Sequence, residues 1–424
     1  MPSIIMMIFT SIYGVVDGYF VSNFVGKTEF AAVNFIFPVI MILGAVGFMF
    51  GTGGSALVAM TLGLGEREKA KKIFSMLVYV SFALGAVISV IGWFALPYVV
   101  KLLGADGEML KNGVTYGRII LLAMPFFVLQ FEFQSFFITA EKPKPGLYVT
   151  VVSGVANMVL DALFMAIFRW GLIGAAAATA LSQVIGGIIP LVYFARKNDS
   201  LLRLTGFEFD GKAFIKACTN GSSEFLNNIS MSLVGMLYNF QLIKFAGENG
   251  VAAYGVLMYV NMIFLAIFIG FVTGIAPVIG YHYGADNHEE LHSLLVKSSK
   301  IIAISSVLML IAAELLAYPL SFIFVGYDIE LMDITLRGFL IYSFSFLFSG
   351  FAIFGSAFFT SLNDGLTSAI MAVVRTLVFQ VTAVIVLPIF FKLDGIWFSV
   401  VAAEFGAALM TLMFIVVKRK KFRY

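Results

Sequence analysis

The chain has 424 residues, of which 61% are hydrophobic and only 12% are charged. A soluble domain is typically about 25% charged, so this composition excludes a soluble enzyme, a disordered chain and a nucleic-acid-binding module. Three histidines and a single cysteine, Cys218, are too few for a disulfide framework or a thiol metal cluster. We therefore expect neither a metal nor a cofactor, and a lipid bilayer is the solvent that suits this composition.

Twelve hydrophobic segments follow one another along the chain, each long enough for the roughly 20 residues that a spanning helix needs. They cover residues 3–25, 31–62, 73–100, 116–138, 146–167, 173–195, 216–245, 252–283, 295–325, 336–361, 366–391 and 395–417. Runs this long and uniformly apolar do not fit the roughly 10-residue alternating strands of a membrane β-barrel. The sequence therefore predicts an all-α polytopic membrane protein with twelve transmembrane helices.

The Lys and Arg residues set the expected orientation, because cytoplasmic loops carry an excess of them. With the N-terminus in the cytoplasm, eighteen lie on the inner side and eight on the outer side or at outer helix ends, while Arg375 lies within a span. This distribution predicts a multi-pass protein of the plasma (inner) membrane with both termini in the cytoplasm. The apolar start at Ile4 leads directly into a full span, which is not the pattern of a cleavable signal peptide.

The chain also contains an internal repeat. With a shift of 221 residues, the stretch 24–63 matches 245–284 at twelve of forty positions. Because each repeat holds six helices, both halves enter the membrane in the same orientation. This predicts two six-helix bundles related by a pseudo-two-fold axis along the membrane normal, with a cleft between them. We place the N-terminal lobe at 1–200, a cytoplasmic linker at 201–215 and the C-terminal lobe at 216–424.

Polar residues form stripes on two of the predicted helices. Ser153, Asn157 and Asp161 share one face of the fifth helix, since they are spaced four residues apart. Tyr13 and Asp17 form a similar stripe on the first helix. An acid inside a bilayer costs about 2.5–3.5 kcal/mol on insertion scales, so each one needs a reason. Two facing stripes would enclose a pocket for a proton or for a hard cation such as sodium, or would only tie the helices together.

A second set of polar residues is a candidate for lining a substrate cleft. It consists of Glu132, of Glu224 and Asn228 on one face of the seventh helix, and of Arg375. Arg375 is expected to neutralise one of the intramembrane acids, and the sequence leaves open which one. Glu404 is more typical of a structural or outer-vestibule residue. The 46 Phe and 20 Met residues also suit flat, apolar, cationic ligands.

Three runs of residues resemble a known family. They are Val16-Asp17-Gly18-Tyr19-Phe20-Val21, Gly154-Val155-Ala156-Asn157-Met158-Val159-Leu160-Asp161 with the following Trp170-Gly171-Leu172-Ile173-Gly174, and Pro277-Val278-Ile279-Gly280-Tyr281. In their order and spacing, the chain resembles the MATE (multidrug and toxic compound extrusion) transporters over nearly its whole length, and in particular their DinF-like bacterial branch.

This resemblance implies two six-helix bundles around a central cleft, and drug export driven by a proton or sodium gradient. In the DinF-like branch a polar cavity of the N-terminal lobe carries the coupling, and its motif positions fall here on Asp17, Asn157, Asp161 and Thr179. Another branch uses acids on the seventh and tenth helices. The predicted tenth helix has no acid here, and under the 221-residue shift Asp17 corresponds to Tyr238. Both features argue against coupling in the C-terminal lobe.

We interpret the chain as a secondary active transporter, not an enzyme, that exports organic cations or amphipathic drugs by antiport with protons or sodium. Its expected partners are these small molecules and membrane lipid, and we expect a monomer. One alternative is a lipid-linked oligosaccharide flippase of the same superfamily, which an excess of acids over bases in the central spans disfavours. An intramembrane enzyme or a channel are further alternatives. The apolar spans contain no GxSxG run with a paired histidine, and paired repeats suit rocking lobes better than a fixed pore.

Overall fold

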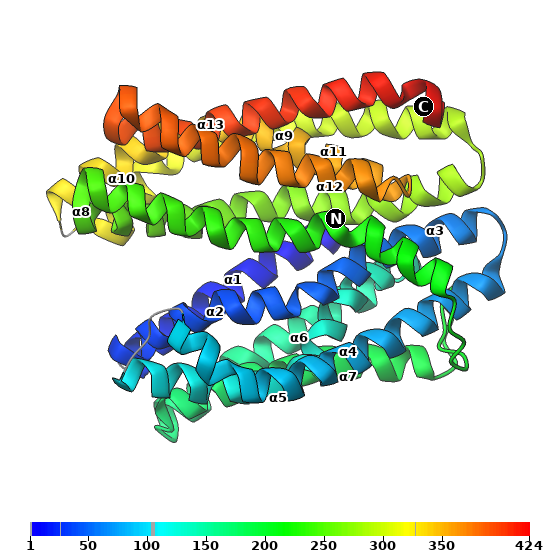
Figure 1. Cartoon of the computed structure of the whole chain (residues 1–424), viewed down its shortest axis with the longest axis horizontal. Helices are drawn as coiled ribbons and strands as arrows, with labels where there is room; N and C mark the ends of the chain where they lie inside the picture. The colour runs from blue at the N-terminus through cyan, green and yellow to red at the C-terminus, as the bar shows by residue number, and fades with distance from the viewer. Residues whose placement is uncertain (1, 26, 103–106, 327) are drawn as a thin grey trace. The chain divides into compact units, whose positions relative to one another are not determined.

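The computed structural model describes residues 2–25, 27–102, 107–326 and 328–424, and these are almost entirely helical (Figure 1). Helices are the expected solution in a bilayer, because they satisfy their own backbone hydrogen bonds where no water is present. The chain divides into two compact units, Met1–Gly221 and Ser222–Tyr424. Each unit has its own helices and its own hydrophobic core, and we describe each by itself.

The first unit begins with a helix that carries the first polar stripe. Its elements are α1 (Pro2–Phe24), α2 (Lys27–Met49), η1 (Phe50–Gly54), α3 (Ser55–Gly63), α4 (Arg67–Leu102), α5 (Gly107–Thr139), α6 (Pro143–Asp161), η2 (Ala162–Ile167) and α7 (Gly171–Ala195). The π-helical segments η1 and η2 continue α2 and α6 without a turn. A π-helical segment widens a helix locally and is often found at functional sites.

Helix α5 is the centre of the first unit, since it packs against α2, α4 and α7. Small residues allow these helices to come close. A Cβ on Gly85 of α4 would lie 2.6 Å from Cα of Pro125, and a Cβ on Gly47 of α2 would lie 2.5 Å from the carbonyl oxygen of Val128. Close packing of this kind is what holds helices together in a membrane, where lipid tails are as apolar as the side chains.

The second unit follows a non-helical connection at residues 196–210. Its elements are most of α8 (Gly211–Gly284), then α9 (His288–Val325), α10 (Ile329–Tyr342), η3 (Ser343–Ser345), α11 (Phe346–Ser361), α12 (Gly365–Val373), η4 (Val374–Gln380) and α13 (Val381–Phe422). Figure 1 shows the chain reversing within α8 and within α13. The backbone leaves the helical conformation there, at Gly247 and at Lys392.

The reversals within α8 and α13 explain why a single helical element can contain two predicted spans. Among the described residues, nine helices are long and apolar enough to cross a membrane. The run Gly365–Phe422 counts once among them although Lys392 divides it, and the nine do not include α1 or the part of α8 before Gly247. Segment 3–25 coincides with α1 to within one residue, and the other predicted segments lie inside helical runs. The prediction of an all-helical polytopic protein is therefore confirmed.

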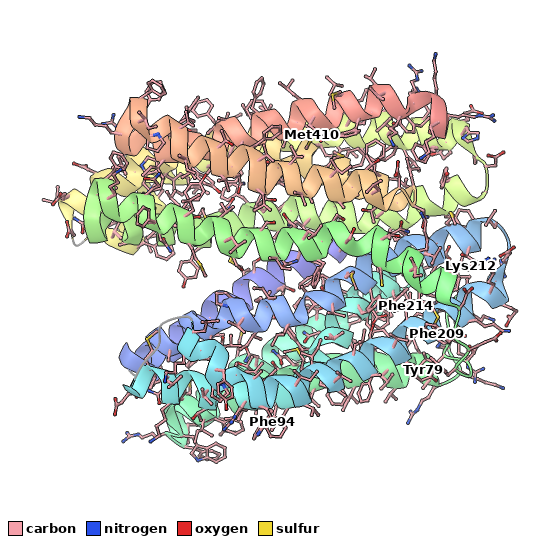
Figure 2. All side chains as sticks on the ribbon, in the orientation of Figure 1. Tyr79, Phe94, Phe209, Lys212, Phe214 and Met410 are labelled. Atoms are coloured by element: carbon pink, nitrogen blue, oxygen red, sulfur yellow. The ribbon has the colours of Figure 1, made fainter. Side chains whose placement is uncertain are left out.

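The connection at residues 196–210 is held against α4. The backbone N–H of Thr205 donates to Oγ of Ser75 at 2.8 Å, and the hydroxyl of Tyr79 donates to the carbonyl of Thr205 at 3.2 Å. Asp210 then caps α8 by accepting from the N–H of Lys212 at 2.9 Å. Figure 2 labels Tyr79 and Lys212 beside this connection. The segment thus follows the surface of the first unit along a fixed path.

The reversals at Gly247 and Lys392 require an unusual backbone. Gly247 has φ 59° and ψ −146°, and Lys392 has φ 52° and ψ −129°. Glycine adopts this region readily, whereas a residue with a Cβ is strained there by about 1–3 kcal/mol. Under the 221-residue shift Lys392 corresponds to Gly171, which opens α7 with φ 56°. The second half of the repeat therefore holds a lysine where the first half holds a glycine.

We predict opposite effects for substitutions at these two turns. Gly247→Ala should lower the free energy of unfolding by about 1–3 kcal/mol, because the new Cβ has open space around it but a strained φ. Lys392→Gly should raise it by about 1 kcal/mol, after the entropic cost of glycine. Thermal unfolding of the purified protein checks both, with Lys392→Ala as the control that keeps the strain. A Gly247→Ala protein as stable as the parent would contradict the argument.

A charged cluster closes the turn between α11 and α12. Oδ2 of Asp364 accepts from Oγ1 of Thr367 at 2.9 Å and from Nζ of Lys418 at 3.2 Å, and Nζ of Lys421 lies 3.6 Å away. Burial raises the pKa of the Asp364 carboxyl, but the bonds from Thr367 and Lys418 outweigh it and hold that pKa below its usual range. The ionised carboxylate therefore stabilises the folded protein.

The sign of this pKa shift predicts a pH dependence. A lowered folded pKa means that Asp364 contributes stability above the ordinary aspartate pKa of about 3.9, and that this contribution is lost as the pH falls through the lowered value. At neutral pH, Asp364→Asn should therefore lower the free energy of unfolding by about 1 kcal/mol. The difference from the parent should vanish in acid. Glu66→Gln, which breaks an exposed ion pair with Lys69, is the control, and a pH-independent difference would contradict the assignment.

Candidate functional site

The two predicted polar stripes meet where α1 packs against α6 (Figure 1). Asp17 of α1 lies close to Asn157 and Asp161 of α6. Asn157 is 2% exposed and Asp161 is fully buried. The structure therefore brings together three polar side chains from helices that lie more than a hundred residues apart in the sequence, and it does so in the interior of the first unit.

A glycine on α6 sets the distance between the two helices. A Cβ on Gly154 would lie 2.6 Å from Cε1 of Phe9 and 2.9 Å from Cδ1 of Tyr13. The missing side chain lets these two rings of α1 lie against the α6 backbone. Asp17 is four residues after Tyr13 and so lies about one turn further along the same face. This packing places the Asp17 carboxyl beside α6.

The charge in this pocket is unbalanced. Oδ1 of Asp17 and both Oδ atoms of Asp161 have no hydrogen-bond donor among the described residues. An ionised carboxylate can only accept hydrogen bonds, so the two acids cannot satisfy each other while both are charged. Two like charges this close and this deeply buried are strongly disfavoured. A proton on either acid would remove this repulsion and supply the missing hydrogen-bond donor.

Three hydroxyl groups border the acid pair. Tyr13 lies close to Asp17 on the same helix. Tyr116 of α5 is 3% exposed and lies near Thr179 of α7 and near both carboxyl groups. Thr179, which the family resemblance implied, is thus beside the pocket. The sequence analysis missed Tyr116, because a lone tyrosine at the start of an apolar segment is also typical of the membrane interface.

Further polar bonds hold the surrounding helices together. Nε2 of Gln130 on α5 donates to Oγ of Ser153 at 3.3 Å, and that hydroxyl donates to the carbonyl of Ser182 on α7 at 2.8 Å. Oγ of Ser182 donates in turn to the carbonyl of Thr179 at 2.8 Å. This chain of bonds continues the α6 stripe and fixes α5, α6 and α7 relative to one another around the acids.

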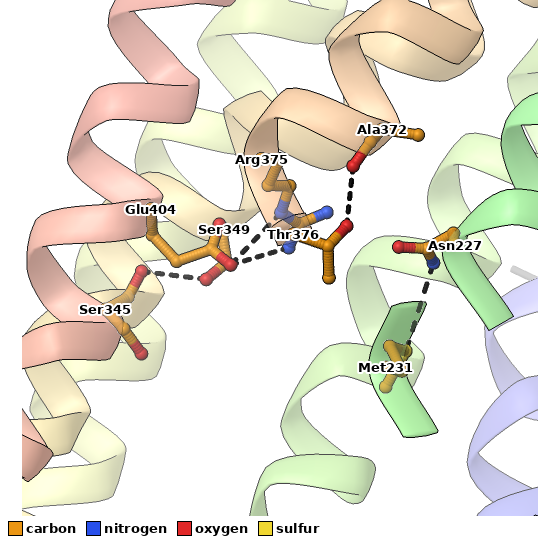
Figure 3. A network of polar contacts seen from close by, with 8 residues as sticks. All are labelled: Asn227, Met231, Ser345, Ser349, Ala372, Arg375, Thr376 and Glu404. Carbon is orange, nitrogen blue, oxygen red and sulfur yellow. Dashed lines mark hydrogen bonds and ion pairs between the residues drawn. The ribbon is translucent and has the colours of Figure 1, made fainter. Parts of the chain in front are cut away.

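The predicted cleft residues divide between the two units. Glu132 belongs to the first unit, is fully buried, and has no hydrogen-bond partner for either carboxyl oxygen among the described residues. Glu224 and Asn228 belong to the second unit, where Nδ2 of Asn228 donates to the Glu224 carbonyl at 2.8 Å. Arg375 is committed to Glu404, the acid that the sequence left unidentified (Figure 3).

A run at the start of α9 has the spacing of a zinc motif. His288-Glu289-Glu290-Leu291-His292 reads His-Glu-x-x-His, the pattern of zinc peptidases. In the structure Nε2 of His288 pairs with Oδ1 of Asp286 at 2.8 Å. Within the part of the chain that the structure describes, no group of three or more His, Cys, Asp or Glu side chains is arranged to hold a metal ion. The run forms the first turn of α9, directly after the charged connection that follows α8.

Comparison with known proteins decides the family. A family model described as MatE matches residues 2–163 and 225–385, with one stretch in each unit. The chain belongs to the MatE family. It is therefore a multi-pass membrane transporter and not an enzyme. The duplicated match agrees with the internal repeat of the sequence.

Curated relatives of this MATE transporter carry an export name. The multidrug export protein MepA of Staphylococcus saprophyticus is 26% identical, over 99% of this chain and 92% of the relative. MepA of Staphylococcus aureus strain MRSA252 is 24% identical, over 99% of this chain and 93% of the relative. These relatives are named MepA rather than DinF, so the assignment to a DinF-like branch stays a prediction.

Solved structures of MATE transporters have the same fold. An outward-facing multidrug resistance MATE transporter of the MOP superfamily matches with a TM-score of 0.94 at 24% identity, over 100% of this chain and 94% of that chain. A MOP superfamily transporter from Pyrococcus furiosus matches with a TM-score of 0.93 at 24% identity, over 100% and 95%. At this level of identity the likeness establishes the fold and no more.

Proposed function

We propose that this MATE transporter exports organic cations or amphipathic drugs from the cell by antiport with protons or sodium ions. The multidrug export name of its MepA relatives supports drug-like small molecules as substrates. In this proposal the lobes at 1–200 and 216–424, joined by the linker at 201–215, are related by a pseudo-two-fold axis. They work as a monomer in the plasma membrane, and coupling takes place in the N-terminal lobe, as in the DinF-like branch.

The observation that carries this proposal is the buried acid pair of the first unit. Asp17 interacts with Asp161, and the oxygens of Asp161 have no donor among the described residues. A proton would turn one acid into a hydrogen-bond donor for the other. A sodium ion would instead use carboxylate, amide and hydroxyl oxygens, which Asn157 and Thr179 add to the pocket. Either cation removes the repulsion between the acids.

The size of this repulsion suits a conformational switch. Two unit charges 4 Å apart repel by about 4 kcal/mol at an effective dielectric constant of about 20. Moving a two-state equilibrium from 1:99 to 99:1 requires about 5.5 kcal/mol of differential binding. Cation binding between Asp17 and Asp161 therefore supplies most of the free energy needed to change the preferred packing of α1 against α6, and with it the preferred opening of the transporter.

The flippase alternative is weaker, because it requires a free cationic surface for a pyrophosphate group. Arg375 is the basic residue that lies within a predicted span, and its guanidinium is bound to Glu404. Glu224 and the buried Glu132 are further acids within the predicted spans. This excess of acids supports cationic substrates.

We predict that Asp17→Asn and Asp161→Asn each reduce gradient-driven export to the level of protein-free liposomes. Neither variant has two charges to neutralise, so cation binding no longer biases the equilibrium. Drug binding should survive at least in part, because the drug occupies the shared cleft rather than the acid pocket. Transport in proteoliposomes with imposed proton or sodium gradients, together with drug affinity by fluorescence, measures both properties and identifies the coupling ion.

Glu314→Gln is the matched control for these variants. Glu314 is an intramembrane acid of the second unit that accepts a hydrogen bond from Ser343, and its replacement should leave export intact. Full export by both aspartate variants would mean that the acid pair is only a structural contact. The coupling role would then move to Glu132 or Glu224.

The orientation in the membrane has its own test. Cysteines at Lys142 and Lys111, introduced separately into a Cys218→Ser background, should be labelled by a membrane-impermeant thiol reagent from opposite sides. The position at 142 should react only after the membrane is opened, because the excess of basic residues places it in the cytoplasm. Labelling of both positions from outside intact cells would refute the orientation.

A further inference from the structure

A buried ion pair occupies the interior of the second unit. Nε and Nη2 of Arg375 donate to the same oxygen, Oε1 of Glu404, at 3.1 and 2.8 Å (Figure 3). The side chain of Glu404 is 4% exposed and that of Arg375 is 17% exposed. Taking two charges out of water costs several kcal/mol for each ion, and good geometry only partly offsets this cost. Stability alone does not account for a pair of this kind in a membrane protein.

Only one of the two carboxylate oxygens of Glu404 is hydrogen-bonded. Oε2 of Glu404 has no hydrogen-bond donor among the described residues. The hydroxyl of Ser349, which Figure 3 shows beside Glu404, donates instead to the carbonyl of Ser345 at 2.9 Å. Tyr342 lies close to both charges, and Glu224 of α8 interacts with Arg375 from another helix. Arg375 is thus the cation that balances two acids in this region.

The backbone helps to present this cation. Arg375 lies in η4, a π-helical segment between α12 and α13. The extra residue in a π-helical turn pushes a side chain out of the regular helical register, which is why such segments recur at functional sites. Glu404 lies on the second helical part of α13, after the reversal at Lys392. The pair therefore joins the last two helical segments of the chain across the interior of the unit.

The internal repeat shows how the two halves differ in charge. Under the 221-residue shift, Asp17 corresponds to Tyr238, Arg375 to Gly154, and Glu404 to Gln183. Tyr238 is 2% exposed and shares a hydrogen bond of 2.7 Å with Ser399. The first half thus holds two acids without a base in its polar core. The second half holds a neutral phenol and an acid that already has a cation.

We propose that Arg375 is a built-in cation of the C-terminal lobe. Its guanidinium fills the place at Glu404 that a free monovalent cation would otherwise take, so this lobe carries a fixed charge pair where the other lobe has an exchangeable cation. That Arg375 thereby confines ion exchange to the acid pair of the other lobe is a consequence that rests on the proposed function. The occupancy of the Glu404 site by the Arg375 side chain does not rest on it.

Removing the arginine side chain and adding its head group as a free ion tests the proposal. Arg375→Ala should lower the thermal unfolding midpoint of the purified protein by several degrees, because the Glu404 carboxylate loses its cation. Millimolar guanidinium chloride should restore the midpoint in a saturable manner, since a ligand that binds only the folded state stabilises it. Choline chloride at the same concentration should not, because the quaternary ammonium is too large and donates no hydrogen bonds.

Two further variants give the matched controls. Arg337→Ala removes an arginine from the exposed pair with Asp394. Guanidinium should shift its unfolding midpoint by as much as it shifts that of the parent. The shift of the parent accounts for any binding of guanidinium at Asp17 and Asp161. Arg375→Ala/Glu404→Gln removes the Glu404 carboxylate together with its cation, and only Glu224 remains of the two acids that Arg375 balances. This double variant should regain stability relative to Arg375→Ala and lose the response to guanidinium.

The outcomes separate the possibilities. If the double variant can be purified in folded form and Arg375→Ala cannot, the proposal is supported. The failure of Arg375→Ala to fold is then due to the Glu404 carboxylate that lost its cation. A double variant no more stable than Arg375→Ala, or an Arg375→Ala protein without a guanidinium response beyond that of the parent, overturns it and leaves Arg375 a packing residue. The measurement uses neither a gradient nor a drug, so its result is independent of whether Asp17 and Asp161 couple transport.

Discussion

The cost of burying a carboxylate in a membrane governs the polar interior of this protein. The described acids meet that cost differently, and the fully buried Glu132 has no hydrogen-bond partner among the described residues. Glu404 has the guanidinium of Arg375, Glu314 has the hydroxyl of Ser343, and Asp17 and Asp161 have each other. The first two acids each have a donor from within the chain. The third is different, since two ionised carboxylates without a donor repel each other until one of them gains a proton. In the proposed function, this difference separates an internal contact from a site whose cation can exchange.

The two halves of the repeat are more similar in backbone conformation than in the charge of their equivalent side chains. The turn at Gly171 and the turn at Lys392 share a positive φ, although the second residue is poorly suited to it. The family match also falls once in each half. Asp17 and Tyr238, in contrast, hold the same place in the repeat with different charge. A duplicated scaffold tolerates this divergence, because helix packing depends on the size of side chains while ion binding depends on a few carboxyl groups.

The fold could be predicted from the sequence because a bilayer imposes one length and one composition on every spanning helix. Segment 173–195, for example, corresponds to α7 (Gly171–Ala195). The stripe from Ser153 to Asp161 was also visible, since helical spacing is a local property. The neighbours of these stripes were not. Tyr116 reaches the acid pair from α5, and Arg375 reaches Glu404 from another helical segment, and such contacts depend on how distant helices pack.

Backbone geometry was the other feature without a sequence signal. The π-helical segment η4 has an ordinary apolar composition around Arg375, and nothing in the sequence marks Lys392 as a residue with positive φ. Both arise because tertiary packing decides the local conformation against its intrinsic preference. The segment η4 contains Arg375 itself, which agrees with the tendency of π-helical segments to occur at functional sites.

The reversals at Gly247 and Lys392 have a mechanical consequence. A turn made by a single residue outside the helical conformation leaves no slack between the two helices that it joins, so a rotation of one is passed on to the other. The two helices on either side of each reversal are therefore expected to move together as a rigid body. Bending within the second unit must then occur inside the helices themselves, where Pro277, Pro388 and η4 interrupt the regular hydrogen bonding. Of these, η4 contains Arg375, so a bend there would move the ion pair with Glu404.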